Sequence, residues 1–327
     1  MANRDSRLVL LCAGVTVFLW ASAFVGIRMV GSHLAPGPLA LGRMLAGSAT
    51  LSAVVAVRAL RRRTPSGDRR NPAEVRTATS RLPRGRLLLG AVAWGVGWFG
   101  LYNVLLNTAE RRVDAGTTAL LVNSAPVLIA VLGGLLLGEG FPRRLLLGLG
   151  IAFLGVALIA VSSLTGDGDV LGVLLALGAA VLYALGATSQ KVLLTRLDAL
   201  TLAWLGALVG TAALLPYLPR LAGEIAEAPT AAVIAVVYLG VFPTGVAFLT
   251  WAYALARTTA GRLAVATYAC PAIVVLLSWL VLAEVPAALS LAGGAACLLG
   301  VAVATVRRRA KQPAGSETPV QARAAAR

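Results

Sequence analysis

Charged residues are scarce in this sequence. Only 13% of its 327 residues are Asp, Glu, Lys or Arg, and 58% are hydrophobic. A soluble globular protein carries about 25% charged residues, so the composition excludes an ordinary water-soluble fold. The charges are also clustered, and they leave uncharged stretches of about 20 residues, the length at which a helix crosses a bilayer. The sequence therefore predicts a helical membrane protein.

Residues that support catalysis or metal binding are few as well. The chain has one histidine, His33, and three cysteines that fall inside apolar stretches. This pattern offers no disulfide framework, metal cluster or catalytic cluster, which argues against an intramembrane hydrolase. The sequence also lacks a G-x-x-x-x-G-K-[ST] phosphate loop, so ATP is not expected as the direct energy source. We expect neither an enzyme nor a metal or cofactor site.

Ten apolar stretches are long enough to form membrane-spanning helices. Turn-forming Gly and Pro residues separate most of them. The exception is the linker of residues 58–86, which contains ten Arg and is expected to be disordered, like the basic tail of residues 307–327. The stretches cover residues 8–30, 36–57, 87–109, 115–138, 145–161, 170–190, 199–218, 230–256, 263–283 and 287–306.

Basic residues fall almost entirely on one side of the expected membrane. With the N-terminus in the cytoplasm, 24 of the 29 Lys and Arg residues lie in cytoplasmic segments, while Arg28 and Arg43 lie inside helices. Cytoplasmic segments are enriched in Lys and Arg. Because Ala, Leu, Gly and Arg dominate, as in GC-rich bacterial genomes, we expect a bacterial inner-membrane protein with both termini cytoplasmic. The net charge of +16 then needs no nucleic-acid partner.

The chain repeats itself. At a spacing of 145 residues, seven Gly, Pro or Glu residues of the first half recur in the second half. Earlier in each half the spacing is 163 residues, and the difference matches the extra length of the Arg-rich linker. Such self-similarity indicates a duplicated unit, so we expect five-helix repeats at residues 8–162 and 169–306. The seven pairs are Gly95/Gly240, Gly100/Gly245, Gly116/Gly261, Pro126/Pro271, Glu139/Glu284, Gly148/Gly293 and Gly155/Gly300.

The odd number of helices in each repeat determines the predicted geometry. The first helix of one repeat runs outward and the first helix of the other runs inward. The predicted fold is therefore an all-α integral membrane protein with ten transmembrane helices in two inverted five-helix repeats. Inverted repeats are typical of secondary transporters, whose substrate site lies near the midplane between the repeats. A duplication kept for packing alone is the alternative.

A tryptophan motif and the paired prolines and glutamates occur together in this chain. The motif is Trp20-Ala21-Ser22-Ala23-Phe24 followed by Arg28, with Pro38 and Arg43 on the next helix. With the repeated proline, glutamate and G-x6-G pattern, it resembles the EamA family of the drug/metabolite transporter superfamily over residues 8–306. The resemblance implies a ten-helix bundle with a central cavity, which usually exports small polar metabolites or amino-acid-like compounds. Tyr183 and Gly206 replace Trp20 and Arg43 in the second half, so an asymmetric cavity is expected.

Arg43 and Arg28 are the cations inside predicted helices, where a charge is costly and often functional. Arg43 is expected either to face the cavity and bind an anionic group, or to reach the headgroups or helix-end carbonyls. Arg28, nearer the surface, is expected to be an interface anchor or an outer gate. Lys191, its counterpart at the spacing of 163, would take the same role at the cytoplasmic mouth.

Polar and aromatic residues at mid-helix complete the candidate substrate site. Asn123 and Tyr268 each precede a helix proline by three residues, and a proline frees a backbone carbonyl upstream. The alternative for this pair is a kink that serves packing. Trp94, Trp98 and Trp279 are expected at the lipid interface or in packing. The candidate substrate contacts are Trp20, Ser22, Phe24, Arg43, Asn103, Asn123, Pro126, Tyr183, Tyr253, Tyr268 and Pro271, with Tyr102, Asn107 and Trp251 as weaker candidates.

Two glutamates and four glycines are given structural roles. Glu139 and Glu284 precede the last helix of each half, where a carboxylate can cap the helix N-terminus. Gly148, Gly155, Gly293 and Gly300 are spaced seven apart in pairs and are expected to allow close helix contact.

The expected function is a secondary transporter, an exporter of small polar metabolites across the inner membrane by alternating access. All 13 acidic residues fall in loops or at helix ends, so no buried carboxylate relay for protons is expected. The expected partners are a small-molecule substrate and the bilayer. One alternative is a carrier of phosphorylated, nucleotide-linked or lipid-linked sugars, and another is a membrane scaffold or receptor that transports nothing.

Overall fold

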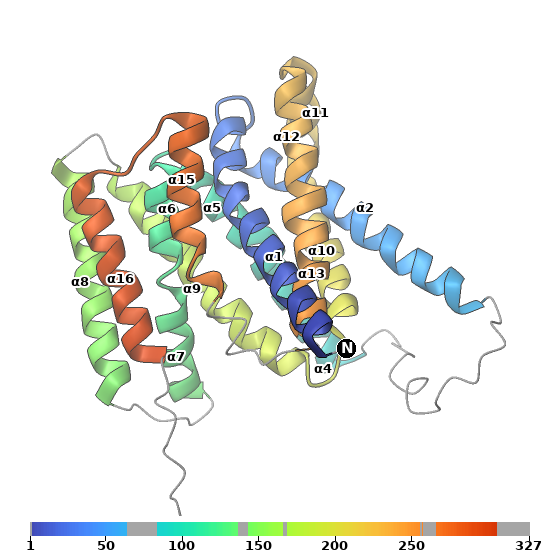
Figure 1. Ribbon diagram of the computed structural model, residues 1–327. Coiled ribbons are helices and arrows are strands. Elements are labelled where there is room, and N and C mark those ends of the chain that lie inside the picture. Colours follow the sequence, from blue (N-terminus) through green and yellow to red (C-terminus); the bar gives the residue numbers. More distant parts are fainter. Residues whose placement is uncertain are drawn as a thin grey trace, which may run out of the picture.

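The computed structural model describes residues 2–63, 84–136, 143–165, 169–255, 257 and 266–305, and these form helices and short turns. The helices pack as one bundle, and α1 begins at the end of the bundle where α16 ends (Figure 1). Residues 64–83, the tail of residues 307–327 and Glu139 lie outside the described residues.

The first half of the chain contributes α1 to α8. Its elements are α1 (Ala2–Val30), α2 (Pro36–Arg63), α4 (Arg86–Gly95), the π-helical segment η1 (Val96–Leu101), α5 (Tyr102–Glu110), α6 (Ala115–Val122), α7 (Ala125–Leu136) and α8 (Arg143–Thr165).

The second half contributes α9 to α16. Its elements are α9 (Val170–Leu193), α10 (Ala199–Leu214), the short 3-10 helix η2 (Leu215–Tyr217), α11 (Leu218–Glu227), α12 (Thr230–Leu239), the π-helical segment η3 (Gly240–Val246), α13 (Ala247–Leu255), α15 (Cys270–Leu282) and α16 (Ala288–Thr305).

Much of this bundle is long and apolar enough to cross a membrane. In the described part of the chain, seven helical segments meet this condition, and Ala115–Ile129, Cys270–Leu282 and Ala288–Val303 are shorter apolar helices. Large apolar side chains cover the outside, where Leu10 is 72% exposed and Phe153 is 71% exposed. A surface of this kind suits lipid rather than water. The chain is a multi-pass membrane protein.

Aspartates begin three of the helices. The Asp114 carboxylate accepts from the Thr117 N–H at 2.8 Å, and the Asp198 carboxylate accepts from the Thr201 N–H at 3.1 Å. Asp169 caps α9 through the Leu171 N–H. The hydrogen bond from Arg112 to Asp169 lowers the pKa of this exposed carboxyl below its usual value. These caps satisfy N–H groups that have no partner within the helix.

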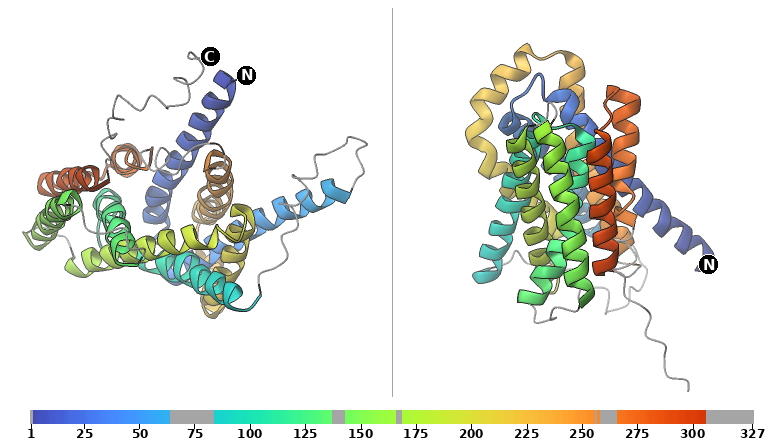
Figure 2. Two further views of the ribbon diagram at one scale, coloured as in Figure 1. Left: turned by 90° about the horizontal axis from the view of Figure 1, so that it is seen from below. Right: turned by 90° about the vertical axis from the view of Figure 1, so that its left-hand side faces the viewer.

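Two segments differ from the sequence expectation. Residues 58–63 continue α2 instead of belonging to a disordered linker, because Arg, Ala and Leu favour helix and no Gly or Pro interrupts them. The last turns of α2 project away from the bundle (Figure 2). The helix α11 was expected as loop. Its Glu224 accepts a hydrogen bond from the Ala35 N–H at 2.8 Å, so α11 also holds the start of α2.

The two π-helical segments occupy corresponding places. The spacing of 145 residues that relates the two halves carries η1 onto η3. A π turn leaves carbonyl groups without their usual helical donors, and side chains fill this role. Asn103 Nδ2 donates to the Phe99 carbonyl at 3.0 Å, and Thr244 Oγ1 donates to the Leu239 carbonyl at 3.1 Å. Pro243, inside η3, has no N–H to donate.

The helices α8 and α16 touch through glycine. A Cβ atom on Gly293 would lie 2.6 Å from the Gly155 carbonyl oxygen, and one on Gly300 would lie 2.6 Å from the Gly148 carbonyl oxygen. Between these contacts, Cys297 Sγ lies 3.4 Å from the Ala152 carbonyl oxygen. The four glycines predicted to allow close packing therefore form one antiparallel contact between the two helices.

Candidate functional site

A cavity of about 110 Å³ lies inside the bundle, between elements of both halves. The volume is several times what one water molecule needs. Its walls come from α1, α2, α5, α9, α13, both π-helical segments, the end of α6, the turn after it, the starts of α7 and α15, and Thr267. Seven aromatic residues line it: Trp20, Phe24, Trp98, Phe99, Tyr102, Tyr183 and Phe248.

The aromatic rings form a continuous wall. Trp98 lies 5.0 Å from Tyr183 between ring centroids. Phe99 lies 5.3 Å from Phe248, which in turn lies 6.1 Å from Trp20. At these separations aromatic rings attract each other beyond their simple burial. The cavity therefore has stiff apolar walls that suit a flat or unsaturated group.

Arg43 supplies the positive charge. Its side chain is only 8% exposed and lines the cavity, where Nε donates to Thr244 Oγ1 at 3.0 Å. Nη1 is buried and has no hydrogen-bond partner among the described residues. Of the two expectations for this residue, the cavity-facing one agrees with the structure. A buried guanidinium with an unused N–H is suited to an incoming carboxylate or phosphate oxygen.

Asn103 supplies an acceptor in the same cavity. It is 3% exposed, and its Nδ2 donates to backbone carbonyls of η1. The Oδ1 atom has no partner within the described ranges. Buried polar atoms of proteins are almost always hydrogen-bonded. The unused acceptor of Asn103 and the unused donor of Arg43 therefore offer two hydrogen bonds to an occupant of the cavity.

Both proline-containing stretches are broken helices. The first is interrupted at Asn123 and Ser124, so that Pro126 lies in the first turn of α7. The second has turn residues at Tyr268 and Ala269, and Pro271 lies in the first turn of α15. Proline is favoured there because the N–H it lacks would have no helical partner. Asn123 and Pro126 line the cavity, but Tyr268 and Pro271 do not.

Several predicted contacts lie elsewhere. Ser22 shares a 2.7 Å hydrogen bond with the Tyr238 hydroxyl, and Tyr253 lies beneath the guanidinium of Arg257, 3.7 Å from ring centroid to Cζ. Tyr268 packs against the α7, α8 and α16 residues around Ala152. Lys191 is exposed near the end of α9. The structure therefore gathers Trp20, Phe24, Arg43, Asn103, Asn123, Pro126 and Tyr183 around the cavity, but not the others.

The structure adds residues that were assigned other roles or missed. Trp98 lines the cavity instead of lying at the lipid interface. Trp94 packs inside, with Nε1 donating to the Gly186 carbonyl at 3.0 Å, whereas Trp279 is 57% exposed. The weaker candidate Tyr102 also lines the cavity. Thr244, Phe248, Thr267 and Cys270 were not singled out, and only their position near the repeated glycines and prolines could have indicated them.

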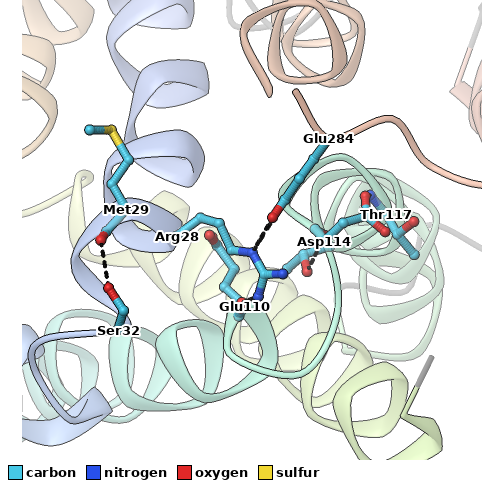
Figure 3. A network of polar contacts seen from close by, with 8 residues as sticks. Arg28, Met29, Ser32, Glu110, Asp114, Thr117 and Glu284 are labelled. Carbon is cyan, nitrogen blue, oxygen red and sulfur yellow. Dashed lines mark hydrogen bonds and ion pairs between the residues drawn. The ribbon is translucent and has the colours of Figure 1, made fainter. Parts of the chain in front are cut away.

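Arg28 joins three elements at the end of the bundle where α1 ends (Figure 3). Its Nε lies 3.0 Å from Glu284 Oε1, and its Nη1 donates to the Glu110 carbonyl oxygen at 2.6 Å. Glu284 therefore pairs with Arg28 and does not cap α16, which begins at Ala288. The capping prediction for Glu284 is corrected accordingly. The nearby guanidinium attracts the carboxylate more strongly than a helix end four residues away.

Glu110 lies at a helix end, as the sequence predicts for the acidic residues, but it is a buried carboxyl group, which the sequence did not predict. Its side chain is 1% exposed, although it stands at the end of α5. The sequence pattern locates the end of the apolar stretch but not the elements that cover it. The described residues hold no group of three or more His, Cys, Asp or Glu side chains that could bind a metal.

The chain is similar to proteins that are named as transporters. The model of the EamA-like transporter family matches residues 7–161 and 170–306. The "Probable terminal-alkyne amino-acid exporter" of Streptantibioticus cattleyicolor is 33% identical over 288 residues, 88% of this chain and 90% of that protein. The "Uncharacterized transporter YdfC" of Bacillus subtilis is 30% identical over 293 residues, 90% of this chain and 89% of that protein.

A solved crystal structure shares the fold. Its TM-score is 0.59 at 21% sequence identity, and the match covers 94% of this chain and 99% of the solved one. The resemblance noted in the sequence is thus confirmed by the family match and by relatives that span nearly the whole chain. The chain belongs to the EamA-like transporter family, and it is a membrane transporter rather than an enzyme.

Proposed function

We propose that this protein is a secondary transporter that exports small amino-acid-like compounds across the bacterial inner membrane by alternating access. The observation that carries the proposal is the pair of unused polar atoms in one aromatic cavity. Arg43 Nη1 is a buried cationic donor and Asn103 Oδ1 is a buried acceptor, and neither has a partner among the described residues.

An amino acid complements these atoms. Its carboxylate would accept from Arg43, and its ammonium group would donate to Asn103, which satisfies both unused atoms at once. Its side chain would lie among the aromatic rings. The broken helices support the same orientation, because the N-terminal ends of α7 and α15 begin at the cavity and favour negative charge. The name of the Streptantibioticus relative, an amino-acid exporter, agrees with this substrate class.

The alternative substrates fit less well. A nucleotide-linked sugar carries two phosphate charges and a large polar surface. Among the described residues that line the cavity, Arg43 is the one charged side chain, and most of the wall is apolar. A carrier of phosphorylated sugars would require further cations there. A scaffold or receptor without transport has no need for unsatisfied buried polar atoms in a cavity between the halves.

The proposal includes two inverted five-helix repeats. Some residues that correspond between the two halves contact each other, as expected for positions on a twofold axis. Ser48 and Thr211 are 163 residues apart and share a 2.7 Å hydrogen bond, and Ala152 and Cys297 are 145 residues apart and also touch. The matching π-helical segments, the matching helix breaks and the two ranges of the family match support the same arrangement.

The proposal also includes ten transmembrane helices, which the seven long segments and the three shorter apolar helices of the described residues support. An even number of crossings agrees with α1 beginning and α16 ending at one end of the bundle (Figure 1). The distribution of Lys and Arg assigns that end to the cytoplasm. On this orientation Arg28 and Glu284 form a gate at the outer end, and Lys191 is the gate residue of the cytoplasmic end.

Transport by purified protein in liposomes tests the proposal. We expect efflux of preloaded L-phenylalanine or L-propargylglycine, and no efflux of UDP-glucose. Arg43→Ala should lower the efflux rate about a hundredfold, since a hydrogen bond to a charged group contributes about 3 kcal/mol. The matched control is Arg111→Ala, at an exposed position, which should transport like the wild type. Efflux of UDP-glucose alone would favour the sugar carrier, and no efflux at all would overturn the proposal.

A further inference from the structure

Glu110 has a carboxylate without a partner. The side chain is 1% exposed, and neither Oε1 nor Oε2 has a hydrogen-bond partner among the residues that the structure describes. Its backbone carbonyl is the group that binds Arg28, at 2.6 Å (Figure 3). An ionised carboxylate buried in this way is costly unless it is paired, whereas a protonated one is neutral and can donate.

The charged groups around Glu110 are already engaged, with one exception. Arg28 of α1 pairs with Glu284, which follows α15. Asp114, before α6, caps that helix through Thr117. Arg43 of α2 keeps a buried Nη1 without a partner in the described part of the chain. These four residues, together with Tyr102 of α5, are the ionisable groups that interact with Glu110, so Arg43 and Glu110 are opposite charges that no hydrogen bond joins.

A row of unused acceptors leads from the cavity to Glu110. Asn103, Asn107 and Glu110 are spaced four and three residues apart on α5, which places them on one face of the helix. All three are at least 97% buried. Like Glu110, Asn107 has an unpaired side-chain oxygen within the described ranges, while its Nδ2 donates to the Pro36 carbonyl at 3.0 Å. Buried acceptors of this kind require a donor, either water or a proton.

We propose that Glu110 is a proton-binding site of the transporter, reached from the cavity along the acceptors of Asn103 and Asn107. In the binding step, the carboxylate takes one proton from water on this path and becomes a neutral carboxylic acid. The structure thereby assigns to the chain a second ligand besides the substrate. The path needs no metal and no group outside the chain other than water.

Proton binding and substrate binding are linked through Arg43. An ionised Glu110 and a bound substrate carboxylate both interact with the positive charge of Arg43, whose Nη1 has no partner among the described residues. When a carboxylate binds at Arg43, Glu110 loses part of this charge and its affinity for a proton rises. The coupling is reciprocal, so protonation of Glu110 strengthens carboxylate binding. This link rests on the proposed function, whereas the proton site itself does not.

Infrared titration of the full-length protein in liposomes tests the site. We expect a carboxylic acid band, sensitive to exchange in heavy water, that is gained as the pH is lowered and lost as the pH is raised. The band should be lost in Glu110→Gln. It should remain in Glu227→Gln, which changes an exposed residue of α11 in the same way, and in Glu284→Gln.

Glu110→Asp guards against a folding defect of the Gln variant. This variant keeps a carboxyl group on a side chain that is one methylene shorter. The titration midpoint should therefore move while the band persists. Absence of a titrating band in the wild type, or an unchanged band in both Glu110 variants, would overturn the inference. Transport of L-phenylalanine without such a band would contradict the proton site alone. A titrating band without transport of any compound would contradict the proposed function alone.

Discussion

The same kind of helix contact occurs twice, each time between a glycine of one half and a π-helical segment of the other, but with different side chains. In one, Gly47 of α2 packs against Thr244 of η3, and Arg43, one turn away, bonds the same threonine. In the other, Gly210 of α10 packs against Phe99 of η1, and Gly206 stands where the first half has Arg43. One contact is polar and charged, and its counterpart is apolar. The backbone repeats, while the chemistry of the cavity comes from one side only.

The comparison separates fold from specificity. Both contacts need a glycine, because a Cβ on Gly47 would lie 2.7 Å from Thr244 Cγ2 and one on Gly210 would lie 3.0 Å from the Phe99 carbonyl carbon. The small residues thus fix how closely the helices approach. The residues at the two contacts, Thr244 with Arg43 in one and Phe99 in the other, decide what the cavity binds. A duplicated unit can therefore keep its helix packing and change its binding specificity by single substitutions.

The glycine contact between α8 and α16 should show the largest effect. We expect Gly155→Val and its counterpart Gly300→Val to lower stability about equally, each by about 3 kcal/mol, since a side chain there must push two backbones apart. Thermal unfolding in detergent measures this. Gly150→Val is the matched control on α8, because nothing lies within 4 Å of a Cβ at that position. A strong effect at Gly155 with none at Gly300 would break the comparison between the halves.

The polar contact should give an intermediate effect. Thr244→Val keeps the shape of the side chain but leaves Arg43 Nε without its acceptor, which costs about 1 to 2 kcal/mol. We expect efflux of L-phenylalanine to fall roughly tenfold, while the exposed Thr195→Val remains at the wild-type rate. If Thr244→Val transported normally, the bond between α2 and η3 would be a packing feature only, like its apolar counterpart.

The gate residues should give the smallest effect. Arg28 and Glu284 are each 29% exposed, and a pair of this kind contributes about 1 kcal/mol or less. Glu284→Gln should shift the protein toward the conformation open at that end, and Lys191→Gln, at the proposed gate residue of the other end, toward the opposite one. Membrane-impermeant maleimide can report this through Cys270, which lines the cavity, after Cys12 and Cys297 are replaced by Ala.

We expect opposite changes of roughly fivefold or less in labelling rate from the two sides. Equal changes in the same direction for the Glu284 and Lys191 variants would show that the two ends do not alternate. A charge-swapped pair, Arg28→Glu with Glu284→Arg, should restore the labelling rate of the wild type if the ion pair itself is responsible.

The sequence predicts the helices better than the site. Apolar length alone locates the helical segments to within a few residues at most ends, and the repeated glycines indicate the contact between α8 and α16. Arg43, Asn103 and Asn123 were found because a polar residue inside an apolar helix is exceptional. Trp98 and Phe248 were not, because an aromatic residue on an apolar helix faces lipid, core or cavity with equal ease.

Glu110 shows why the remainder could not be predicted. Its position at the end of a helix suggests exposure, and only the approach of α1, α2 and the segment after α15 buries it. The π-helical segments are a second example. They change which side chains face inward by a fraction of a turn. The glycine pairs at η1 and η3, Gly95/Gly240 and Gly100/Gly245, indicate close packing and not a π turn, and Pro243 occurs in one segment only.

The contact between α8 and α16 has a mechanical consequence. Backbone atoms lie against backbone atoms at the glycines, and the small side chain of Cys297 packs between these points. A joint of this kind cannot slide gradually, so the two helices should travel together as a single strut whenever the protein changes shape. Any opening toward either compartment then has to occur among the other helices, which move relative to the rigid pair of α8 and α16.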